Sequence, residues 1–512
     1  MPAAFFLFLN FVVSSVKILF VSRLTYLLFL IFLFLFLRRF NLNKILRVII
    51  AGISSIIFIY GIVQKFVLFP IYIQAVVPHD DFYTQAMITR FKGGRIFSIF
   101  SLPTLYAIIC TVFIVFIFHY LISPETKSGK QKWAWSLLLA IGLFNLILTQ
   151  SFGGIIYLSV GGLVYLLLSG ILKPRYLIPV IMVFALFFSI IAALRFSEVK
   201  ELEPIKLRFS NWTQAARIIA ANPLWGSGLG NYETEVAFHT LHTEAKSIYA
   251  HNFFLQFVAE TGGIFILLLL LFLFSVRKHL IINDYKEKTV YITTLAVIIV
   301  YNLIDIGFYF FSAGLITAVV LSQIYGDVSA VDSVESAPLQ RKRMPTLLIG
   351  ILFFLSALLA IEAISDNFRK NADYLKAQKE ISEATKLYDL SIALNPYNYK
   401  AMTGYASIPH ILDGNNNQNQ KASGYLNRSL ELNPDSAYAH YLKSSQLFIQ
   451  QHYLGAYYHA EAAKQKNPII DYYKEWVSYI KKNLQQAMEQ QNPSHPIKPE
   501  IWESPVSYGT GK

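Results

Sequence analysis

The sequence predicts an all-α fold, in which a polytopic bundle of membrane helices precedes a soluble helical-repeat domain and a short tail. Of the 512 residues, 55% are hydrophobic and only 15% are charged, whereas soluble domains are about 25% charged. Apolar stretches of roughly 17 to 25 residues, long enough to cross a bilayer, recur as far as residue 362. Beyond that point charge rises and the apolar residues follow a helical period.

The membrane domain, residues 1–362, contains eleven candidate spans. They lie at about residues 4–21, 24–37, 45–63, 102–122, 133–149, 153–169, 176–194, 252–274, 289–304, 306–325 and 345–361, with boundary errors of roughly 2 to 4 residues. The second stretch is short, which leaves open a hairpin formed by the first two. No small-residue cleavage site follows the apolar N-terminus cleanly, so we expect a retained first span rather than a signal peptide.

Lys and Arg cluster in alternate loops, and such clusters mark the cytoplasmic side of a membrane protein. With a cytoplasmic N-terminus, five clusters fall on that side: Arg38, Arg39, Lys44 and Arg47; Lys127, Lys130 and Lys132; Lys173 and Arg175; Arg277, Lys278, Lys286 and Lys288; and Arg341, Lys342 and Arg343. Residues 64–101, the large loop 195–251 and the C-terminal domain are then periplasmic. The Lys and Arg of the short loops between spans are the simplest source of the net charge of +13. No basic stripe lies on a soluble module, so nucleic-acid binding is not expected.

Residues 363–490 carry a repeated signal for helix ends. Leu394-Asn395-Pro396, Leu432-Asn433-Pro434 and Lys466-Asn467-Pro468 recur 38 and 34 residues apart, each closing a helical stretch. A period of about 34 residues built from helix pairs resembles tetratricopeptide repeats. A generic helical bundle is the alternative, and both readings give a module that could hold a protein partner. Residues 491–512, rich in Pro, Ser and Gly, are expected to be disordered.

The large loop contains two arginines around a tryptophan. Arg208 and Arg217 lie nine residues apart. If residues 208–220 are helical, Arg208 and Trp212 share one face and Arg217 points elsewhere. A guanidinium group forks onto phosphate oxygens, which favours Arg208 as an anion ligand. The alternative is an arginine that only reaches for the membrane surface.

A glycine block follows in the same loop. Gly226, Gly228 and Gly230 alternate with other residues in a stretch that lacks the strand–turn–helix context of a dinucleotide fingerprint. Such a tight loop lets the backbone approach a ligand or a neighbouring span closely. A plain turn after a helix explains the pattern equally well.

His251 lies where the large loop re-enters the membrane. An imidazole at that boundary is a natural general base, and a hydrogen-bonded interfacial histidine is the alternative. His239 and His242 invite a metal site with His251 or Glu244, but the spacing is loose and we expect no metal.

Two carboxylates fall in apolar stretches. Glu260 and Asp305 would be costly there without a partner, so structural pairing is at least as good an explanation as catalysis. The other outer segment, residues 90–103, places Arg90, Lys92 and Arg95 just before a span. These cations could form a second binding group for an anion. The alternative is that the segment is an interfacial amphipathic helix.

Together these motifs resemble the bacterial O-antigen ligase and polymerase family. The resemblance covers about residues 85–326 and is carried by Arg208 and Trp212, the glycine block 222–232, the block from His251-Asn252 to Gly262, the segment 95–103 and the Asp305 segment. The glycine and histidine blocks are fairly specific in combination. Members of the family with C-terminal tetratricopeptide repeats are familiar.

The resemblance implies a glycosyltransferase of the C-type architecture in the bacterial inner membrane. Its donor would be a glycan on undecaprenyl diphosphate, handled at the periplasmic face without metal or other cofactor. His251 would deprotonate the acceptor hydroxyl, while Arg208 would hold the diphosphate and stabilise its charge as it leaves. Arg95 would help to bind the same group. Arg217, Trp212, Gly228 and Asn252 complete the expected substrate-binding residues.

One departure and several alternatives remain. Family members often show Ser-Arg-Gly before the large loop, whereas Phe152 stands at the place of the arginine here. The acceptor is open: lipid A core, a growing polysaccharide, or a protein, as in protein O-oligosaccharyltransferases. A transporter or flippase of lipid-linked glycan would show ionisable or broken sites at mid-membrane, but the polar residues concentrate in the outer loops. A non-catalytic scaffold that works through its repeats is the third class.

Overall fold

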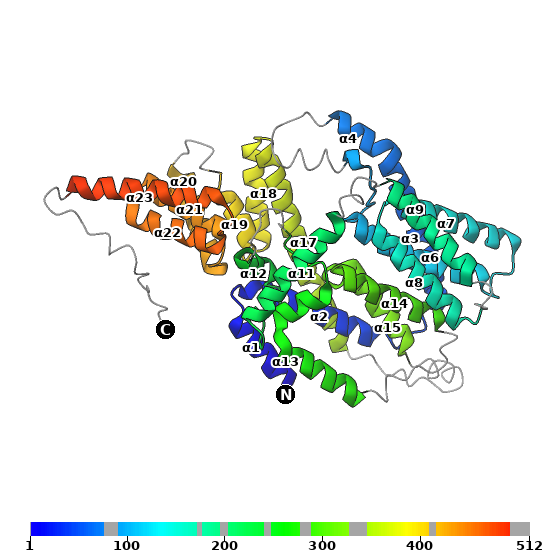
Figure 1. The fold of residues 1–512 in the computed structure, drawn as a ribbon. Helices are drawn as coiled ribbons and strands as arrows, with labels where there is room; N and C mark the ends of the chain where they lie inside the picture. Colours follow the sequence, from blue (N-terminus) through cyan, green and yellow to red (C-terminus); the bar gives the residue numbers. More distant parts are fainter. Residues whose placement is uncertain are drawn as a thin grey trace. The chain divides into compact units, whose positions relative to one another are not determined.

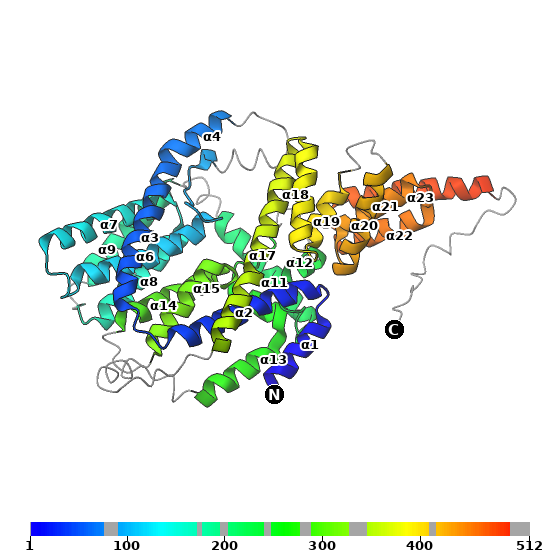
Figure 2. The same ribbon diagram turned by 180° about the vertical axis from the view of Figure 1, so that it is seen from behind.

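The computed structural model is all-helical over the residues that it describes, which are 2–75, 91–171, 177–194, 203–239, 247–276, 288–326, 346–408 and 416–491 (Figures 1 and 2). The chain divides into two compact units. Unit 1 is Met1–Glu233 with Ser247–Ala363, and unit 2 is Thr234–Lys246 with Ile364–Lys512. Part of the large loop is therefore grouped with the C-terminal helices.

Unit 1 holds the apolar helices together with the more polar α11 and the start of α12. They are α1 (Pro2–Val13), α2 (Lys17–Leu37), α3 (Asn43–Val63), α4 (Phe69–Ala75), α6 (Pro103–Ile122), α7 (Gly129–Leu148), α8 (Phe152–Leu168), α9 (Leu177–Leu194), α11 (Glu203–Ala221), the start of α12 (Tyr232–His239), α13 (Phe253–Val276), α14 (Thr289–Ile304), α15 (Phe311–Ile324) and most of α17 (Thr346–Ala377). A π-helical turn, Gln64–Leu68, joins α3 to α4, and a 3-10 turn, Gly307–Tyr309, precedes α15.

Five segments of the described chain are long and apolar enough to cross a membrane. They are Lys17–Leu37, Asn43–Gln74, Pro103–Ile122, Gly129–Leu148 and Leu348–Ala377. Shorter apolar helices lie at Phe152–Leu168, Phe253–Leu268, Thr289–Ile304 and Phe311–Ile324. The protein is thus a helical multi-pass membrane protein, and the count of eleven spans stays a prediction.

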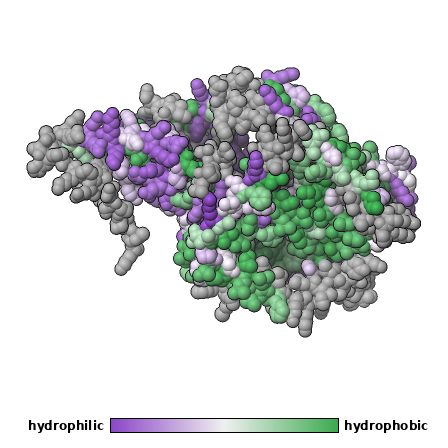
Figure 3. Space-filling view, in the orientation of Figure 1, coloured by the Kyte–Doolittle hydropathy of each residue, from purple (hydrophilic) through white to green (hydrophobic). Residues whose placement is uncertain are grey.

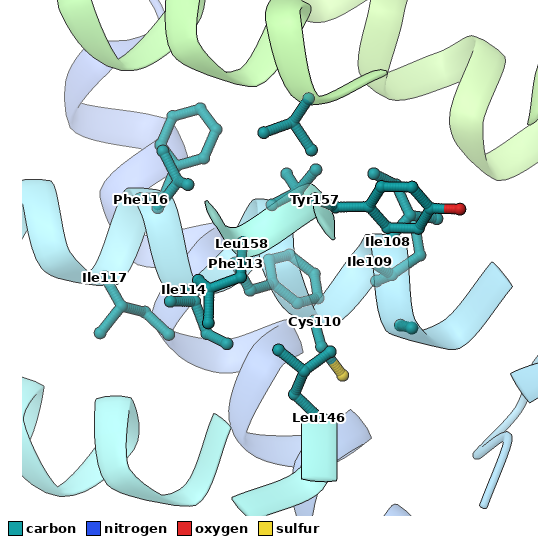
Figure 4. Packing of buried hydrophobic residues seen from close by; sticks show 14 of the residues in the cluster. Ile108, Ile109, Cys110, Phe113, Ile114, Phe116, Ile117, Leu146, Tyr157 and Leu158 are labelled. Atoms are coloured by element: carbon teal, nitrogen blue, oxygen red, sulfur yellow. The ribbon is translucent and has the colours of Figure 1, made fainter. Parts of the chain in front are cut away.

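Helix α6 is the centre of the core of unit 1. It contacts α3, α7, α8 and α14, so it is surrounded on every side, as expected of a helix that is apolar all round. Tyr106, Cys110 and Ile117 on α6 are 0% exposed. Figure 4 shows Phe113 and Cys110 of α6 close to Leu146 of α7 and to α8. This core fixes the frame from which the outer loops start.

The first helices end elsewhere than the sequence suggests. Instead of spans at 4–21 and 24–37, the structure has a break at residues 14–16 followed by one uninterrupted helix, α2. Asn231 explains the break, because its side-chain oxygen accepts the Val16 amide at 2.9 Å and its amide donates to the Ser14 hydroxyl. A residue far along the chain thus satisfies backbone that a helix would otherwise pair.

Three later helices also differ from the expected spans. Helix α13 is kinked at Gly262, whose φ is +73°. The expected span 306–325 begins with the 3-10 turn, so α15 starts only at Phe311. The expected span 345–361 continues as α17 to Ala377, because the helical pattern runs on from the apolar part into the polar part.

Unit 2 is a stack of helices. It contains the end of α17, α18 (Ile381–Leu394), α19 (Tyr399–Ala406), α20 (Asn416–Leu432), α21 (Ala437–Ile449), α22 (Tyr453–Lys466) and α23 (Asp471–Gln491). From α18 on, each helix contacts the next. The three Asn-Pro signals end α18, α20 and α22, as expected. The assignment of these helices to tetratricopeptide repeats stays a prediction, as do the domain bounds 1–362 and 363–490.

The two units differ in surface. Figure 3 shows largely hydrophobic surface over the described helices of unit 1 and mainly hydrophilic surface over α21 to α23. Exposed apolar side chains of unit 1, among them Val48, Ile56 and Phe353, suit a lipid environment. Several predicted features lie outside the described residues: the loop positions Lys173, Arg175, Arg277, Lys278, Lys286, Arg341, Lys342 and Arg343, and residues 492–512 of the predicted tail.

Candidate active site

Asp305 joins an imidazole to a guanidinium group. Its Oδ1 lies 3.0 Å from Nδ1 of His251 and also accepts the Ile306 amide at 3.0 Å. Its Oδ2 lies 3.6 Å from a terminal nitrogen of Arg208. The side chain of Asp305 is only 1% exposed, whereas those of His251 and Arg208 are 24% and 26% exposed. A buried carboxylate therefore holds two groups that still reach the surface.

Helix α11 supplies Arg208 and Trp212. Both residues lie within this helix, so their spacing of four places them on one face. The Trp212 indole donates to the backbone carbonyl of His251 at 3.4 Å. The same helical face thus contacts the histidine through its backbone and the shared aspartate through Arg208.

The start of α13 is tied to the end of α14. Asn252 accepts the Leu255 amide at 3.0 Å, as an N-cap does, and its amide donates to the Leu303 carbonyl at 2.9 Å. The Phe253 amide donates to the Asp305 carbonyl at 2.9 Å. These bonds support the positive φ of +51° at His251, a conformation that costs a non-glycine residue about 1–3 kcal/mol.

The charge of Asp305 fixes the hydrogen on His251. Burial alone raises the pKa of Asp305, but the hydrogen bond from His251 and the charge of Arg208 outweigh it, so the pKa lies below its ordinary value. A carboxylate can only accept hydrogen bonds. Nδ1 of His251 must therefore carry the hydrogen, which leaves Nε2 with the lone pair that can take a proton.

Arg95 lies at the end of α7. Its Nε donates to the Thr149 carbonyl at 3.1 Å, and Thr149 is close in sequence to Phe152. The Phe152 ring packs against Phe188 of α9, with centroids 5.8 Å apart. Arg217 follows Arg208 by nine residues on α11, which puts it on the opposite side of that helix. The contacts described so far thus join Arg208, Trp212, His251 and Asn252, while Arg95 contacts Thr149 and Arg217 lies on the opposite side of α11.

The glycine block belongs to a second buried cluster. The Gly228 amide donates to the Glu260 carbonyl at 2.9 Å, and a Cβ on Gly228 would lie 2.6 Å from Cα of Ser14. The Glu260 carboxylate accepts the Gly230 amide at 2.7 Å and the Tyr309 hydroxyl at 2.6 Å. This close approach to other helices gives the glycines a packing reason. A contact of Gly228 with substrate stays a prediction.

Sequence reasoning did not assign Asp305 to the site. Its signal was present, since a carboxylate in an apolar stretch needs a partner, but the partner was not identifiable. Two buried tyrosines, Tyr157 and Tyr301, also interact electrostatically with Asp305 and Arg208. No group of three potential metal ligands occurs among the described residues, and His242 and Glu244 lie outside them.

One family model matches part of the chain. No curated protein matches the chain. The matching family model begins within α7, ends within α13, and includes Arg208, Trp212, Gly228, His251 and Asn252 but neither Arg95 nor Asp305. Residues 137–273 match the family described as O-antigen ligase, which supports that family for this chain and, at the family level, a membrane glycan-transfer activity.

Proposed function

We propose that the protein is a glycosyltransferase of the bacterial inner membrane, facing the periplasm, that transfers or polymerises glycan from an undecaprenyl-diphosphate donor. The observation that carries the proposal is the pairing of Asp305 with both His251 and Arg208. A base and a cation held by one buried carboxylate suit a reaction that removes a proton at one point and releases a phosphate anion at another.

His251 is the base in this proposal. Nε2 takes the proton of the acceptor hydroxyl as that oxygen bonds to the anomeric carbon of the donor sugar. The bond from this carbon to the phosphate oxygen breaks, and the diphosphate leaves with the electron pair. Asp305 holds the imidazole in the required tautomer and stabilises the imidazolium that forms.

Arg208 stabilises the leaving diphosphate. Its guanidinium group is partly exposed and only 3.6 Å from Asp305, so nitrogen atoms remain to fork onto phosphate oxygens. Beside a membrane the low dielectric strengthens this attraction. Trp212, Asn252, Gly228, Arg95 and Arg217 are proposed to bind other parts of the substrate, and Arg95 to provide a second cation near Phe152.

Lipid A core, a growing polysaccharide and a protein all offer the hydroxyl group that the mechanism needs. We propose that the helices of unit 2 hold the acceptor or an assembly partner. Analysis of lipopolysaccharide, secreted polysaccharide and glycoproteins from a deletion strain would identify the acceptor by the fraction that changes.

The direct test uses the full-length protein in nanodiscs with an undecaprenyl-diphosphate-linked glycan and an acceptor. His251→Ala and Arg208→Ala should each reduce transfer about a hundredfold or more. Gly52→Ala is the matched control, because a Cβ there meets nothing within 4 Å. Undiminished transfer by both variants would refute the roles proposed for His251 and Arg208, whereas a wild-type protein that binds a partner but transfers no glycan would favour a scaffold. A wild-type protein in liposomes that moves the lipid-linked glycan between leaflets without transferring it would favour a flippase.

A further inference from the structure

The hydroxyl group of Tyr301 is buried without a hydrogen-bond partner among the described residues. The residue is 0% exposed. Buried polar atoms are almost always paired, and one that is not lowers stability and calls for an explanation. Unfavourable features of this kind persist mainly where function needs them.

Tyr301 lies next to the candidate active site. It is in the last turn of α14, four residues before Asp305. Its ring packs edge-on against Tyr157, with centroids 5.3 Å apart, and so closely against Gly307 that a Cβ there would lie 2.4 Å from it. The hydroxyl group interacts electrostatically with Asp305 and Arg208. The packing holds an unpaired donor close to the charges of the site.

The two oxygens of Asp305 are unequally bonded. Oδ1 accepts two hydrogen bonds, one from Nδ1 of His251 and one from the Ile306 amide, each at 3.0 Å. The described contact of Oδ2 is the 3.6 Å approach of Arg208, which is longer than a hydrogen bond of about 2.7 to 3.2 Å. Oδ2 therefore has room to accept a hydrogen bond.

We propose that Tyr301 is a positioning residue that replaces Arg208 on Oδ2 of Asp305 when Arg208 turns to an anionic diphosphate. The proposal rests on the function proposed above and deepens it. A buried carboxylate that loses its cation is costly unless another donor takes its place. With the tyrosine hydroxyl on Oδ2, Asp305 stays ionised and keeps its bond to His251, while the charge of Arg208 acts on the substrate.

This exchange, in which the Tyr301 hydroxyl takes the place of Arg208 on Oδ2 of Asp305, predicts an unusual response to Tyr301→Phe. The substitution removes only the hydroxyl oxygen. Within the described part of the chain this oxygen has no partner, so its loss should not lower the stability of the ligand-free protein. In the diphosphate-bound state it would leave Oδ2 without a donor, so binding should weaken. A structural hydroxyl would give the opposite pattern.

Tyr232 provides the matched control. It is also buried, at 1% exposure, and its hydroxyl group is also unpaired among the described residues. It belongs to the cluster around Glu260, with which it interacts electrostatically. Tyr232→Phe therefore removes a hydroxyl oxygen that is buried and unpaired like that of Tyr301, but that belongs to the Glu260 cluster and not to the Asp305 site.

The experiment measures undecaprenyl diphosphate binding, the donor KM and the thermal midpoint of the full-length protein in nanodiscs. Tyr301→Phe should raise both the Kd and the KM about tenfold, the effect of one charge-assisted hydrogen bond, and leave kcat and the ligand-free midpoint unchanged or the midpoint higher. Tyr232→Phe should leave Kd and KM as in the wild type. Wild-type binding by Tyr301→Phe, or a lowered midpoint with unchanged Kd, would overturn the exchange.

The same measurements separate this inference from the function beneath it. A wild-type protein that neither binds the lipid diphosphate nor transfers glycan would refute the proposed function, and the exchange with it. If the wild-type protein binds the lipid diphosphate and transfers glycan, and Tyr301→Phe has the same Kd, KM, kcat and thermal midpoint, the exchange alone is refuted.

Discussion

Nδ1 of His251 lies 3.0 Å from Oδ1 of Asp305, although the two residues are 54 positions apart in the sequence. The contact bridges the start of α13 and the end of α14. A carboxylate that orients an imidazole, which in turn faces the surface, is the arrangement of a base with its orienting group. The effect of replacing Asp305 depends on this contact.

The first prediction concerns Asp305→Asn. The amide keeps the size of the carboxylate but can donate to Nδ1 of His251, so the hydrogen moves to Nε2 and the lone pair is lost where the base needs it. We expect glycan transfer to fall by about a hundredfold to ten-thousandfold, as when other catalytic histidines lose the right tautomer. Turnover by purified protein in nanodiscs measures this effect.

The control for Asp305→Asn is Asp389→Asn in unit 2. Asp389 is a partner of Lys421 at 2.8 Å, and its loss should not change turnover. Transfer by Asp305→Asn at the wild-type rate would show that the carboxylate does not orient the base.

The second prediction tests the packing reason for the glycine block. Gly228 has a φ of +97°, and its Cβ would collide with the backbone of Ser14 at 2.6 Å. We expect Gly228→Ala to lower the free energy of unfolding by about 2 kcal/mol or more, through backbone strain and overpacking. Thermal unfolding in detergent measures it. An unchanged midpoint, with weaker donor binding, would instead favour a contact with substrate.

Gly52→Ala is the comparison for this substitution. Gly52 lies inside α3, and a Cβ there meets nothing within 4 Å. Alanine in a helix is favoured over glycine by about 0.5–1 kcal/mol, so the variant should be as stable as the wild type or slightly more stable.

The third prediction is a loss of stability of unit 2 in acid. Burial and the charges of His440 and Lys443 lower the pKa of His459 from 6.5 to about 4, and its Nδ1 lies 2.9 Å from that of His440. Because the folded pKa is below the unfolded value, the unfolded chain binds more protons between them. Stability is therefore fully present above about pH 6.5 and is lost as the pH falls toward 4.

Circular dichroism of the full-length protein checks this pH dependence. The thermal midpoint of unit 2 should fall between about pH 7.5 and pH 5, and it should fall less in His459→Phe. His452→Asn, at an exposed position, should behave as the wild type. An equal fall in wild type and His459→Phe would assign the acid sensitivity to other groups.

Much of the helical framework could be predicted from local pattern. The span expected at 289–304 coincides with α14, and that at 102–122 differs from α6 by one residue at its start. Apolar length sets such helices directly. The helical face shared by Arg208 and Trp212 followed from their spacing, because that relation lies within one helix.

The features that could not be predicted from local pattern depend on contacts between distant segments. The break before α2 is stabilised by Asn231, and nothing in the local sequence of the first span marks that partner. The pairing of Asp305 with His251 likewise arises from the way α13 and α14 meet. Hydrophobic periodicity describes one segment at a time, so it identifies a carboxylate that needs a partner without identifying the partner.

The last prediction concerns Lys466, which organises the part of the large loop that is grouped with unit 2. Its Nζ lies 5.1 Å from the ring centroid of Phe238 and pairs with Asp435. Burial and Asp435 raise the pKa of Glu235, while Lys466 opposes them. Lys466→Ala should therefore leave Phe238 uncovered and remove the lysine charge between Glu235 and Asp435, so α12 should exchange its amide hydrogens up to about tenfold faster. Lys464→Ala removes only a surface pair with Glu461 at 3.1 Å and should not change the exchange; equal exchange in both variants would show that Lys466 does not hold α12.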